Sequence, residues 1–272
     1  MELLNKKYNF LTPLRFQNLK RYGRNADGGY VCDDNIVKNT NILITFGMGP
    51  DWSFELDYIK DNSDVKIFMY DYTVTASPYI KDVWKYFRRF ITFRGELKSF
   101  TDRLTILKNY LNFFKIKNVN FFPEKITYPV KNSIDTDIDK VFNRLDSNEN
   151  TKGKSVILKS DIEGSEFEVI DGIVNYSNRI DALIFEFHWL DKNEEVFVDS
   201  IRKLQKFFDI AHIHGNNHCE KLNTGLPITL EMTLINKKYT PKNIEYINSF
   251  PVKGLDHPNN PTKKDLVFKF NS

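Results

Sequence analysis

The feature that most constrains the fold of this chain is a series of short apolar runs, separated by segments with helical periodicity. Six runs have the length of a buried strand, at residues 41–46, 66–71, 119–124, 155–161, 181–188 and 209–214. Runs that are apolar on both faces and alternate with helices are typical of a parallel sheet that is covered on both sides. We therefore predict an α/β fold with a mostly parallel sheet and helices on both faces.

Two of the intervening segments have the apolar spacing of an amphipathic helix. In residues 99–114 the apolar row consists of Phe100, Leu104, Leu107, Leu111 and Phe114. In residues 194–208 it consists of Phe197, Ile201, Leu204 and Phe208. These are the clearest helices that the sequence predicts.

The end of the predicted sheet differs from the rest. Residues 227–238 alternate apolar and polar side chains after a short loop, which predicts an antiparallel return strand. A mostly parallel, seven-stranded sheet with one antiparallel strand is the Rossmann-like architecture of class I methyltransferases. We expect one such domain over residues 1–272, with extensions at about 1–40 and about 240–272 packed on it.

Composition and charge narrow the class of protein. Hydrophobic residues make up 41% and charged residues 28%, a globular balance, and the formal net charge of +3 is too small to favour a nucleic-acid partner. No stretch approaches the ~20 apolar residues of a membrane-spanning helix, and the N-terminus lacks the apolar segment of a signal peptide. Cys32 and Cys219 have neither metal-site nor disulfide-framework spacing, so we expect a cytoplasmic protein. The oligomeric state is not indicated.

A glycine turn, Gly47-Met48-Gly49, follows the first apolar run and precedes a predicted helix. Glycines at such a turn permit positive φ angles and bring backbone N–H groups close to a ligand. Asp71 ends the next predicted strand, where an acidic residue can bind ribose hydroxyls. A dinucleotide fingerprint would need a third glycine at the position of Trp52, so the sequence favours an adenosine cofactor without a pyrophosphate.

Three further residues belong to this part of the prediction. Met48, within the turn, and Tyr72, directly after Asp71, are included among the cofactor-binding residues. Glu55 lies in the first turns of the following helix, and two interpretations stay open for it. It is either an acid favoured by the helix N-terminal dipole or a contact to the cofactor.

The run 155–161 ends in an acidic segment that is the most informative for chemistry. Ligands of doubly wound sheets lie beyond the carboxyl ends of the strands, and Asp161 lies at such an end. Strand alternation puts Lys159 on the same side as Asp161, and it likewise pairs Glu186 with His188 on the next run. We expect a buried ion pair between Lys159 and Glu186, and functional roles for Asp161 and His188.

Four of the five histidines lie within residues 188–218. His212 and His214 are two residues apart on a predicted strand, so their imidazoles share a face and could hold a metal together with Asp161 and His188. A divalent metal is left open by the sequence. The interpretation that we favour is a general base that takes the proton of a substrate hydroxyl, with His188 or His214 as the candidate.

Several motifs resemble those of the FkbM-type methyltransferase family, and together they span almost the whole chain in order. The segment 158–173 is similar to the most characteristic stretch of that family, and reads LKSDIEGSEFEVIDGI. Six more segments resemble one subgroup of the family: RNADGGYV (24–31), FGMGPDWSFE (46–55), MYDYTV (69–74), FEFHWL (185–190), HIHGNN (212–217) and LDHPNNP (255–261). The resemblance implies an S-adenosylmethionine-dependent O-methyltransferase that modifies a hydroxyl of a sugar or glycan precursor.

The resemblance also implies places for individual residues. The glycine turn and Asp71 would line the cofactor, and Asp161 would lie close to the methyl donor. The segment 27–31, with Asp27 and Tyr30, would pack over the cofactor. From the residues alone, this segment is also explained as an Asp-Gly turn that leads into a strand.

Two other functions remain open on the residues. Asp135 and Asp137 form a D-x-D triplet of the kind that holds a metal and a sugar nucleotide in glycosyltransferases, although aspartates are equally expected at the start of a helix. The chain could also be a non-catalytic domain that binds the cofactor. The basic and aromatic segment 77–96 either covers the acceptor site or forms an amphipathic surface helix.

Overall fold

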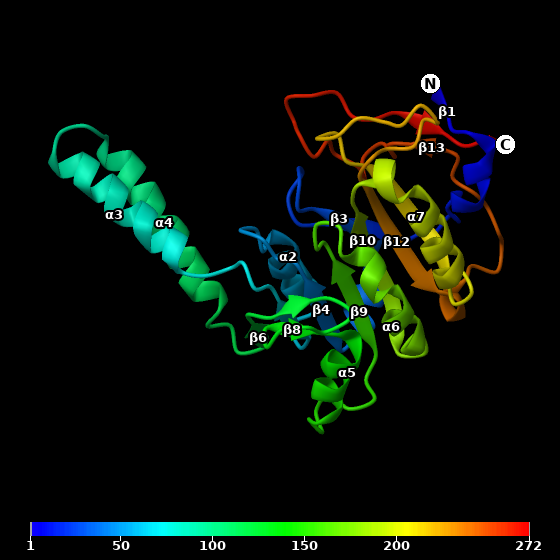
Figure 1. Cartoon of the computed structure of the whole chain (residues 1–272), viewed down its shortest axis with the longest axis horizontal. Helices are drawn as coiled ribbons and strands as arrows, with labels where there is room; N and C mark the ends of the chain where they lie inside the picture. The colour runs from blue at the N-terminus through cyan, green and yellow to red at the C-terminus, as the bar shows by residue number, and fades with distance from the viewer. Residues whose placement is uncertain (1, 272) are drawn as a thin grey trace.

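The computed structural model describes residues 2–271, which contain a central seven-stranded sheet in the order β11-β12-β10-β9-β4-β5-β6 (Figure 1). Its strands are β11 (Phe208–Gly215), β12 (Leu230–Asn236), β10 (Ile180–Phe187), β9 (Val156–Ser160), β4 (Ile42–Phe46), β5 (Lys66–Tyr70) and β6 (Val119–Phe122). Strand β12 is antiparallel to both of its neighbours, whereas the pairs from β10 to β6 are parallel. This order, with its single antiparallel strand, is that of the class I methyltransferase fold, and it confirms the predicted architecture.

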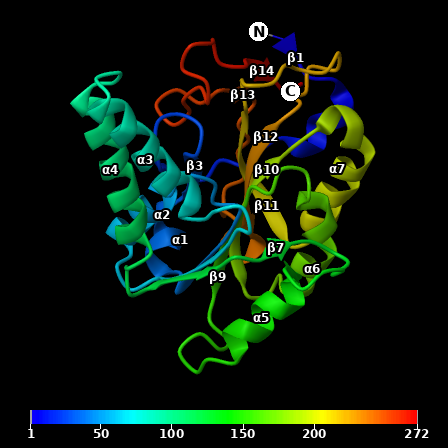
Figure 2. The same ribbon diagram turned by 60° about the vertical axis from the view of Figure 1, so that its left-hand side comes forward.

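Helices cover both faces of the sheet, as Figure 2 shows. One face carries α5 (Ile138–Asp146), α6 (Ile170–Asn175) and α7 (Leu190–Leu204), and the other carries α1 (Asp34–Asn39) and α2 (Ser53–Asp61). Successive residues of a strand point to opposite faces. In β4, for example, Ile42 and Ile44 enter the core beneath α5–α7, and Leu43 enters the core beneath α1 and α2. Each parallel strand is therefore apolar on both sides.

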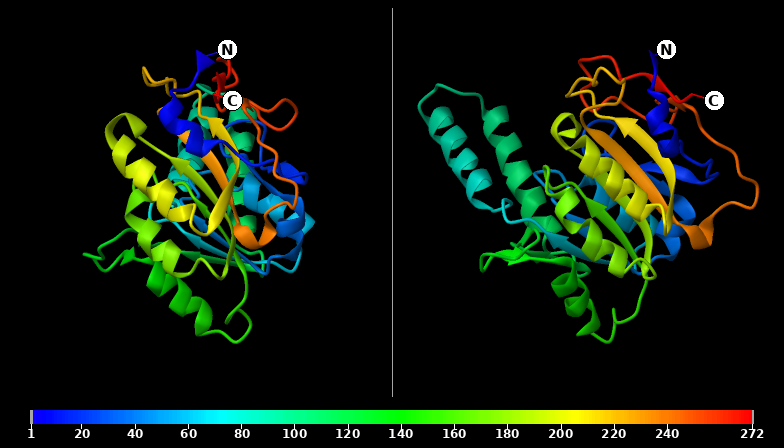
Figure 3. Two further views of the ribbon diagram at one scale, coloured as in Figure 1. Left: turned by 90° about the vertical axis from the view of Figure 1, so that its right-hand side faces the viewer. Right: turned by 45° about the vertical axis from the view of Figure 1, so that its right-hand side comes forward.

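The two ends of the described chain lie together (Figure 3). β1 (Glu2–Leu3) pairs with β14 (Phe268–Lys269), which pairs in turn with β13 (Ser249–Phe250). The remaining short elements are η1 (Lys6–Leu11), β2 (Leu19–Tyr22), β3 (Tyr30–Asp33), β7 (Lys125–Ile126), β8 (Asp135–Thr136), η2 (Glu166–Val169) and η3 (Lys237–Tyr239). The division into one domain with two extensions stays a prediction.

Helices α3 (Ser77–Ile91) and α4 (Leu97–Phe113) form a hairpin that projects from the body of the molecule (Figures 1 and 3). Helix α4 is the first of the two predicted helices, but Leu104 and Leu111 of its apolar row are 40% and 43% exposed. The buried residues of α4 are Tyr110 and Phe113, so the side of the helix that carries Leu104 and Leu111 does not face the core. Helix α3 has no buried residue, so segment 77–96 forms an amphipathic surface helix.

The second predicted helix is α7, which buries Phe197, Ile201 and Leu204 as its periodicity indicates. It begins at Leu190, and Phe208 belongs to β11. Within residues 2–271, no helix combines the length and the apolar character that crossing a bilayer requires.

Candidate active site

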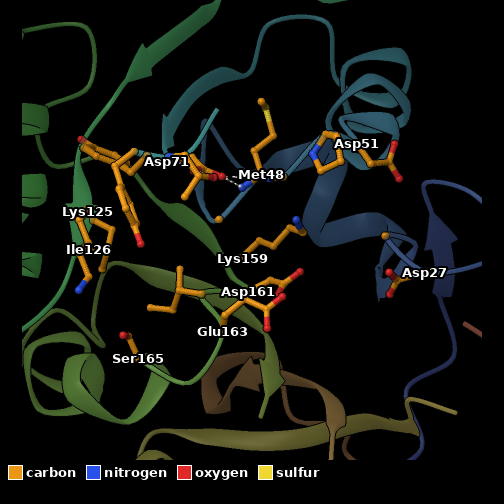
Figure 4. A pocket seen from close by; sticks show the side chains of 18 of the residues that line it. Asp27, Met48, Asp51, Asp71, Lys125, Ile126, Lys159, Asp161, Glu163 and Ser165 are labelled. Atoms are coloured by element: carbon orange, nitrogen blue, oxygen red, sulfur yellow. Dashed lines mark hydrogen bonds between the residues drawn. The ribbon is translucent and has the colours of Figure 1, made fainter. Parts of the chain in front are cut away.

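A cleft of about 500 Å³ opens at the carboxyl ends of β4, β5 and β9 (Figure 4). This volume is typical of a site for a small molecule or cofactor, and the place is where ligands bind in doubly wound sheets. The cleft brings together most of the predicted site residues: Asp27, Tyr30, Gly47, Met48, Gly49, Asp71, Tyr72 and Asp161. None of the residues that line it comes from α3.

The glycine turn after β4 has the left-handed backbone that the sequence predicted, with φ of +70° at Gly47 and +58° at Gly49. A Cβ atom on Gly47 would lie 1.6 Å from the carbonyl oxygen of Asp161, so glycine is required for the loops after β4 and β9 to meet. A Cβ atom on Gly49 would meet nothing within 4 Å, because this residue borders the cleft. The first glycine therefore serves packing, and the second keeps space for a ligand.

Asp71 holds this turn in its shape. Its Oδ2 accepts the N–H groups of Met48 and Gly49 at 2.9 and 3.0 Å, and its Oδ1 accepts the N–H and hydroxyl of Thr73 at 2.7 and 2.6 Å. The two N–H groups that could have faced a phosphate are thus already occupied by a carboxylate. The turn is poorly suited to a pyrophosphate, as the presence of Trp52 indicated.

The wall of the cleft is rich in carboxylates. Six acidic residues line it, namely Asp27, Asp51, Asp71, Glu124, Asp161 and Glu163, against three basic residues, namely Arg24, Lys125 and Lys159. Arg24 is paired with Asp51 at 3.0 Å, which reduces the free positive charge further. A ligand with net positive charge is favoured here, and one with a pyrophosphate is disfavoured.

The prediction of an ion pair between Lys159 and Glu186 was wrong. Lys159 Nζ lies 3.9 Å from Glu55 Oε1 and packs over the ring of Tyr30, while Glu55 is fully buried and accepts the hydroxyl of Thr45 at 2.9 Å. The reason is that Lys159 points toward α2, the helix that carries Glu55. Glu55 does not line the cleft, so its position gives no support to a cofactor contact.

Asp161, Glu186 and His188 form a compact group at the inner wall of the cleft, which we call the acid–histidine cluster. Their ligand atoms all lie within 4.8 Å of one another. The Tyr30 hydroxyl lies 2.8 Å from Asp161 Oδ2 and 3.0 Å from Glu186 Oε2. Asn216 donates to Glu186 Oε1 at 2.6 Å. Strands β9 and β10 are neighbours, which is why their ends bring these side chains together.

The charges around His188 change its protonation. Burial acts to lower its pKa, but the hydrogen bond to Glu166 and the charges of Glu166, Glu186 and Asp161 outweigh it and raise the pKa to about 10. Burial and the carboxylates of Asp161 and Glu231 raise the pKa of Glu186 well above its usual range. With only these groups present, His188 is an imidazolium at neutral pH and has no free lone pair.

The loops that carry the cluster are held in uncommon backbone conformations. Among residues 2–271, three non-glycine residues have positive φ angles, and two of them are here, Glu163 at 54° and Trp189 at 57°. Residues in such conformations cluster at functional sites, where the surrounding structure holds them. Glu163 follows Asp161 by two positions, and Trp189 directly follows His188.

The other two histidines of the predicted set lie elsewhere. His214 is fully buried, with Nδ1 3.1 Å from Glu231 and Nε2 3.1 Å from Asp265. His212 Nε2 lies 3.0 Å from Asp256. Both are on β11, the edge strand, and β12 and β10 separate it from β9. His214 is therefore not a base that faces the cleft, and the two histidines do not share a metal site with Asp161.

The D-x-D triplet is used by the backbone. The Asp137 carboxylate caps α5 by accepting the N–H of Lys140 at 2.9 Å, and the Asp135 carboxylate accepts the N–H groups of Lys131 and Asn132. Neither aspartate lines the cleft. The helix-start interpretation is confirmed for Asp137, whereas Asp135 belongs to β8.

Three contacts of the site were not predicted. Glu166, Asn216 and the hydroxyl of Tyr30 all reach the cluster from loops or from another element. The segment around Tyr30 is held by Asn259, whose side chain donates to Asp27 at 3.3 Å. Two segments that carry the family resemblance, 24–31 and 255–261, thus lie against each other.

The sequence matches no known family model, and no curated protein is similar to it. Similar solved structures include a precorrin-6y C5,15-methyltransferase from Geobacter metallireducens, with TM-score 0.35, 11% identity, and coverage of 75% of this chain and 88% of that chain. Fibrillarin from Methanococcus jannaschii has TM-score 0.37, 8% identity and coverage of 74% and 68%. Human methyltransferase-like protein 13, in complex with SAH, has TM-score 0.40, 8% identity and coverage of 79% of each chain. At these values the likeness carries no argument about activity, and the fold assignment rests on the strand order.

Proposed function

We propose that this protein is an S-adenosylmethionine-dependent O-methyltransferase of the FkbM type, which transfers a methyl group to a hydroxyl of a sugar or glycan precursor in the cytoplasm. The observation that carries the proposal is the acid-rich cleft against a glycine turn whose N–H groups are already bonded to Asp71. S-adenosylmethionine has an adenosine, no phosphate and a net positive charge, so it suits this lining. The family resemblance of the motifs supports the sugar acceptor.

The residues that would hold the cofactor are those around the turn. Gly47, Met48 and Gly49 would lie beneath it, and Asp71 and Tyr72 beside it. Asp27 and Tyr30 would close the site from the opposite wall. The open space at Gly49, which a Cβ atom would enter, fits a ligand that packs against the backbone. When bound, S-adenosylmethionine supplies a methyl group that is activated on a sulfonium sulfur.

The chain itself would position the acceptor and take up its proton. Asp161 lines the cleft, so an acceptor hydroxyl would lie against the acid–histidine cluster, which receives the proton that the hydroxyl loses. His188 lies directly behind Asp161, with its Nε2 3.8 Å from Asp161 Oδ1. Positioning of two reactants can contribute ~7–11 kcal/mol, and proton transfer by a placed group typically ~10²–10⁴-fold in rate.

Binding calorimetry tests the cofactor. We expect S-adenosylmethionine and S-adenosylhomocysteine to bind, and NAD⁺ and UDP-glucose with Mn²⁺ not to bind, because the cleft offers no N–H cradle for a pyrophosphate. Binding of UDP-glucose without binding of S-adenosylmethionine would instead favour a glycosyltransferase.

Transfer of a labelled methyl group to a panel of free sugars, sugar nucleotides and oligosaccharides tests the reaction. Replacement of His188 with Ala should lower turnover ~10²-fold or more and leave the affinity for S-adenosylmethionine nearly unchanged, because His188 lies outside the predicted cofactor residues. Cofactor binding with no transfer to any acceptor of the panel would support the non-catalytic alternative.

A further inference from the structure

His188 is oriented in the way that metal-bound histidines are. Its Nδ1 lies 3.0 Å from Glu166 Oε1, and Glu166 is fully buried and also accepts the N–H groups of Ile162 and Gly164. Both oxygens of Glu166 already accept backbone N–H groups, so we assign Nδ1 of His188 as the donor to this carboxylate. Metal-ligating histidines almost always donate their second ring nitrogen to a carboxylate or carbonyl in this way. The ring nitrogen that remains, Nε2, then faces the cluster.

Three carboxylates surround that nitrogen at distances too long for hydrogen bonds. His188 Nε2 is 3.6 Å from Glu163 Oε2, 3.8 Å from Asp161 Oδ1 and 3.9 Å from Glu186 Oε1. The His188 side chain is only 10% exposed, so water has limited access to it. The Nε2 of a mostly buried side chain thus lies near three carboxylate oxygens without a hydrogen bond to any of them. This spacing fits ligands arranged around a shared ion, since metal–ligand bonds of ~2.0–2.3 Å hold neighbouring ligand atoms about 3–4 Å apart.

The Tyr30 hydroxyl also cannot satisfy both carboxylates of the acid–histidine cluster. A phenol has one proton, yet the Tyr30 oxygen is within hydrogen-bond distance of both Asp161 and Glu186. One of these carboxylates therefore receives no hydrogen bond from it. Lys159 lines the same cleft, and its Nζ lies 3.9 Å from Glu55. The His188 ring also lies beside Asp161 and Glu186, but at 3.8 and 3.9 Å its Nε2 is too far from either carboxylate for a hydrogen bond.

We propose that Asp161, Glu186 and His188 bind one divalent cation at the inner wall of the cleft. Two carboxylate oxygens and one imidazole nitrogen are the mixed set that first-row divalent ions such as Mn²⁺ accept, and Glu163 is placed to join them. The carboxylates alone would be a cluster of acids. The His188 side chain, 10% exposed and held through Nδ1 by Glu166, adds a nitrogen donor beside them and makes the set specific. Asp161 lines the cleft, so the coordination positions that the protein leaves open face the bound ligands.

The role of this cation rests on the proposed function. An acceptor hydroxyl that coordinates it would have a lower pKa, because the ion stabilises the oxygen anion. The proton passes to a carboxylate of the cluster or to water. The oxygen–methyl bond then forms as the sulfur–methyl bond of the donor breaks, and the sulfur leaves as a neutral thioether. Two neighbouring hydroxyls, as in a sugar diol, could both reach one ion, which gives the acceptor class a chemical basis.

Titration of the full chain with Mn²⁺ tests the site without any methyl transfer. The protein is treated with EDTA, dialysed, and titrated by calorimetry and by electron paramagnetic resonance of free Mn²⁺. We expect one saturable site, and we expect each of Asp161→Asn, Glu186→Gln and His188→Gln to weaken the affinity at least ~10-fold. Glu124→Gln, which removes another acid of the same cleft, is the matched control and should bind Mn²⁺ like the wild type.

A second measurement covers variants that fold poorly. Co²⁺ in place of Mn²⁺ gives a visible spectrum that depends on its ligands, so the wild type alone shows whether a nitrogen donor is present. Absence of saturable binding in the wild type, or equal loss in Glu124→Gln and the cluster variants, would overturn the cation site.

The cation site and the proposed function can fail independently, and the experiments tell the two failures apart. If S-adenosylmethionine binds and methyl transfer proceeds at the same rate with EDTA, the cation inference fails and the proposed function stands. If Mn²⁺ binds as expected and S-adenosylmethionine does not, the cation site stands and the function fails.

Discussion

At the scale of residues, the cleft depends on two glycines that have similar backbone angles and different surroundings. Gly47 lies against the carbonyl of Asp161, and Gly49 lies against open space. The first therefore connects the glycine turn to the loop that carries the acid–histidine cluster. A change at Gly47 must displace Asp161, whereas a change at Gly49 need not.

Alanine at each glycine separates these roles. Gly49→Ala should cost ~1–2 kcal/mol of stability, which is the usual cost of a left-handed backbone for a residue with a Cβ, and it should weaken S-adenosylmethionine binding. Gly47→Ala should cost at least ~3 kcal/mol, because a backbone clash is added to the same strain. Urea unfolding and cofactor titration measure the two effects. Equal losses of stability would show that the contact with Asp161 does not matter.

At the scale of elements, the start of α5 decides how the D-x-D triplet is used. Asp137 accepts a backbone N–H in the first turn of the helix, which satisfies one of the donors that a helix leaves free at its N-terminus. A metal-binding triplet would instead need its carboxylates in the cleft. The two interpretations predict different consequences of the same substitution.

Asp137→Ala should therefore lower the free energy of unfolding by about 1 kcal/mol, as the loss of a helix cap typically does. The affinity for Mn²⁺ and the rate of methyl transfer should stay as in the wild type. Chemical denaturation and the Mn²⁺ titration check both parts. A loss of cation affinity with unchanged stability would return the triplet to the candidate metal sites.

The strands were predictable because alternation and run length report burial on both faces, and α7 was predictable for the same kind of reason. The apolar row of α4 predicted that a helix forms, but it did not predict which element the helix packs against. Periodicity does not tell whether a row faces a sheet or another helix. The sequence predicted the correct side of β9 for Lys159, but it predicted Glu186 as the ion-pair partner, whereas the structure has Glu55. Glu55 comes from α2, and the sequence gives no measure of how a helix is rotated over a strand.

At the scale of the whole molecule, His214 links the sheet to the C-terminal segment. It lies between Glu231 on β12 and Asp265 near the end of the chain, and the charge of Asp256 also acts on it. Burial acts to lower its pKa, but the hydrogen bonds that the ring makes to Asp265 and Glu231 outweigh it and raise the pKa to about 10, from the usual 6.5. The imidazolium is thus a structural cation at neutral pH.

Because the folded pKa is the higher one, this group stabilises the fold fully below about pH 6.5, and the contribution is lost as pH rises through about 10. As pH rises from about 6.5 to about 10, we expect the free energy of unfolding to fall by an amount of order 1.4 kcal/mol for each unit of pKa difference, and the urea midpoint to fall with it. In the His214→Asn variant, the free energy of unfolding should depend less on pH over this range. NMR titration of the wild-type imidazole is independent of the variant, and a pKa near 6.5 would contradict the prediction.

Most of the residues that line the cleft could be predicted, because the carboxyl ends of parallel strands meet at one edge whatever the loops do. The contacts of His214 could not be predicted, since Asp265 arrives from a C-terminal segment with no periodic pattern. The same is true of Glu166, whose role depends on the left-handed backbone at Glu163. The loops that supply the hydrogen-bond partners of His188 and His214 have no periodic pattern of apolar residues, so their contacts could not be predicted from the sequence.

The projecting hairpin makes the molecule an electric dipole. Residues 77–113 contain eight lysines and arginines and three acids, a net charge of +5, so the rest of the chain carries −2. The positive pole is the far end of the hairpin, and the negative pole includes the carboxylate-lined cleft. Near an anionic surface or polymer, the resulting torque turns the hairpin toward that surface. At physiological salt this acts only over distances of about the Debye length, ~8 Å. The molecule would approach such a surface in one preferred orientation, which added salt would abolish.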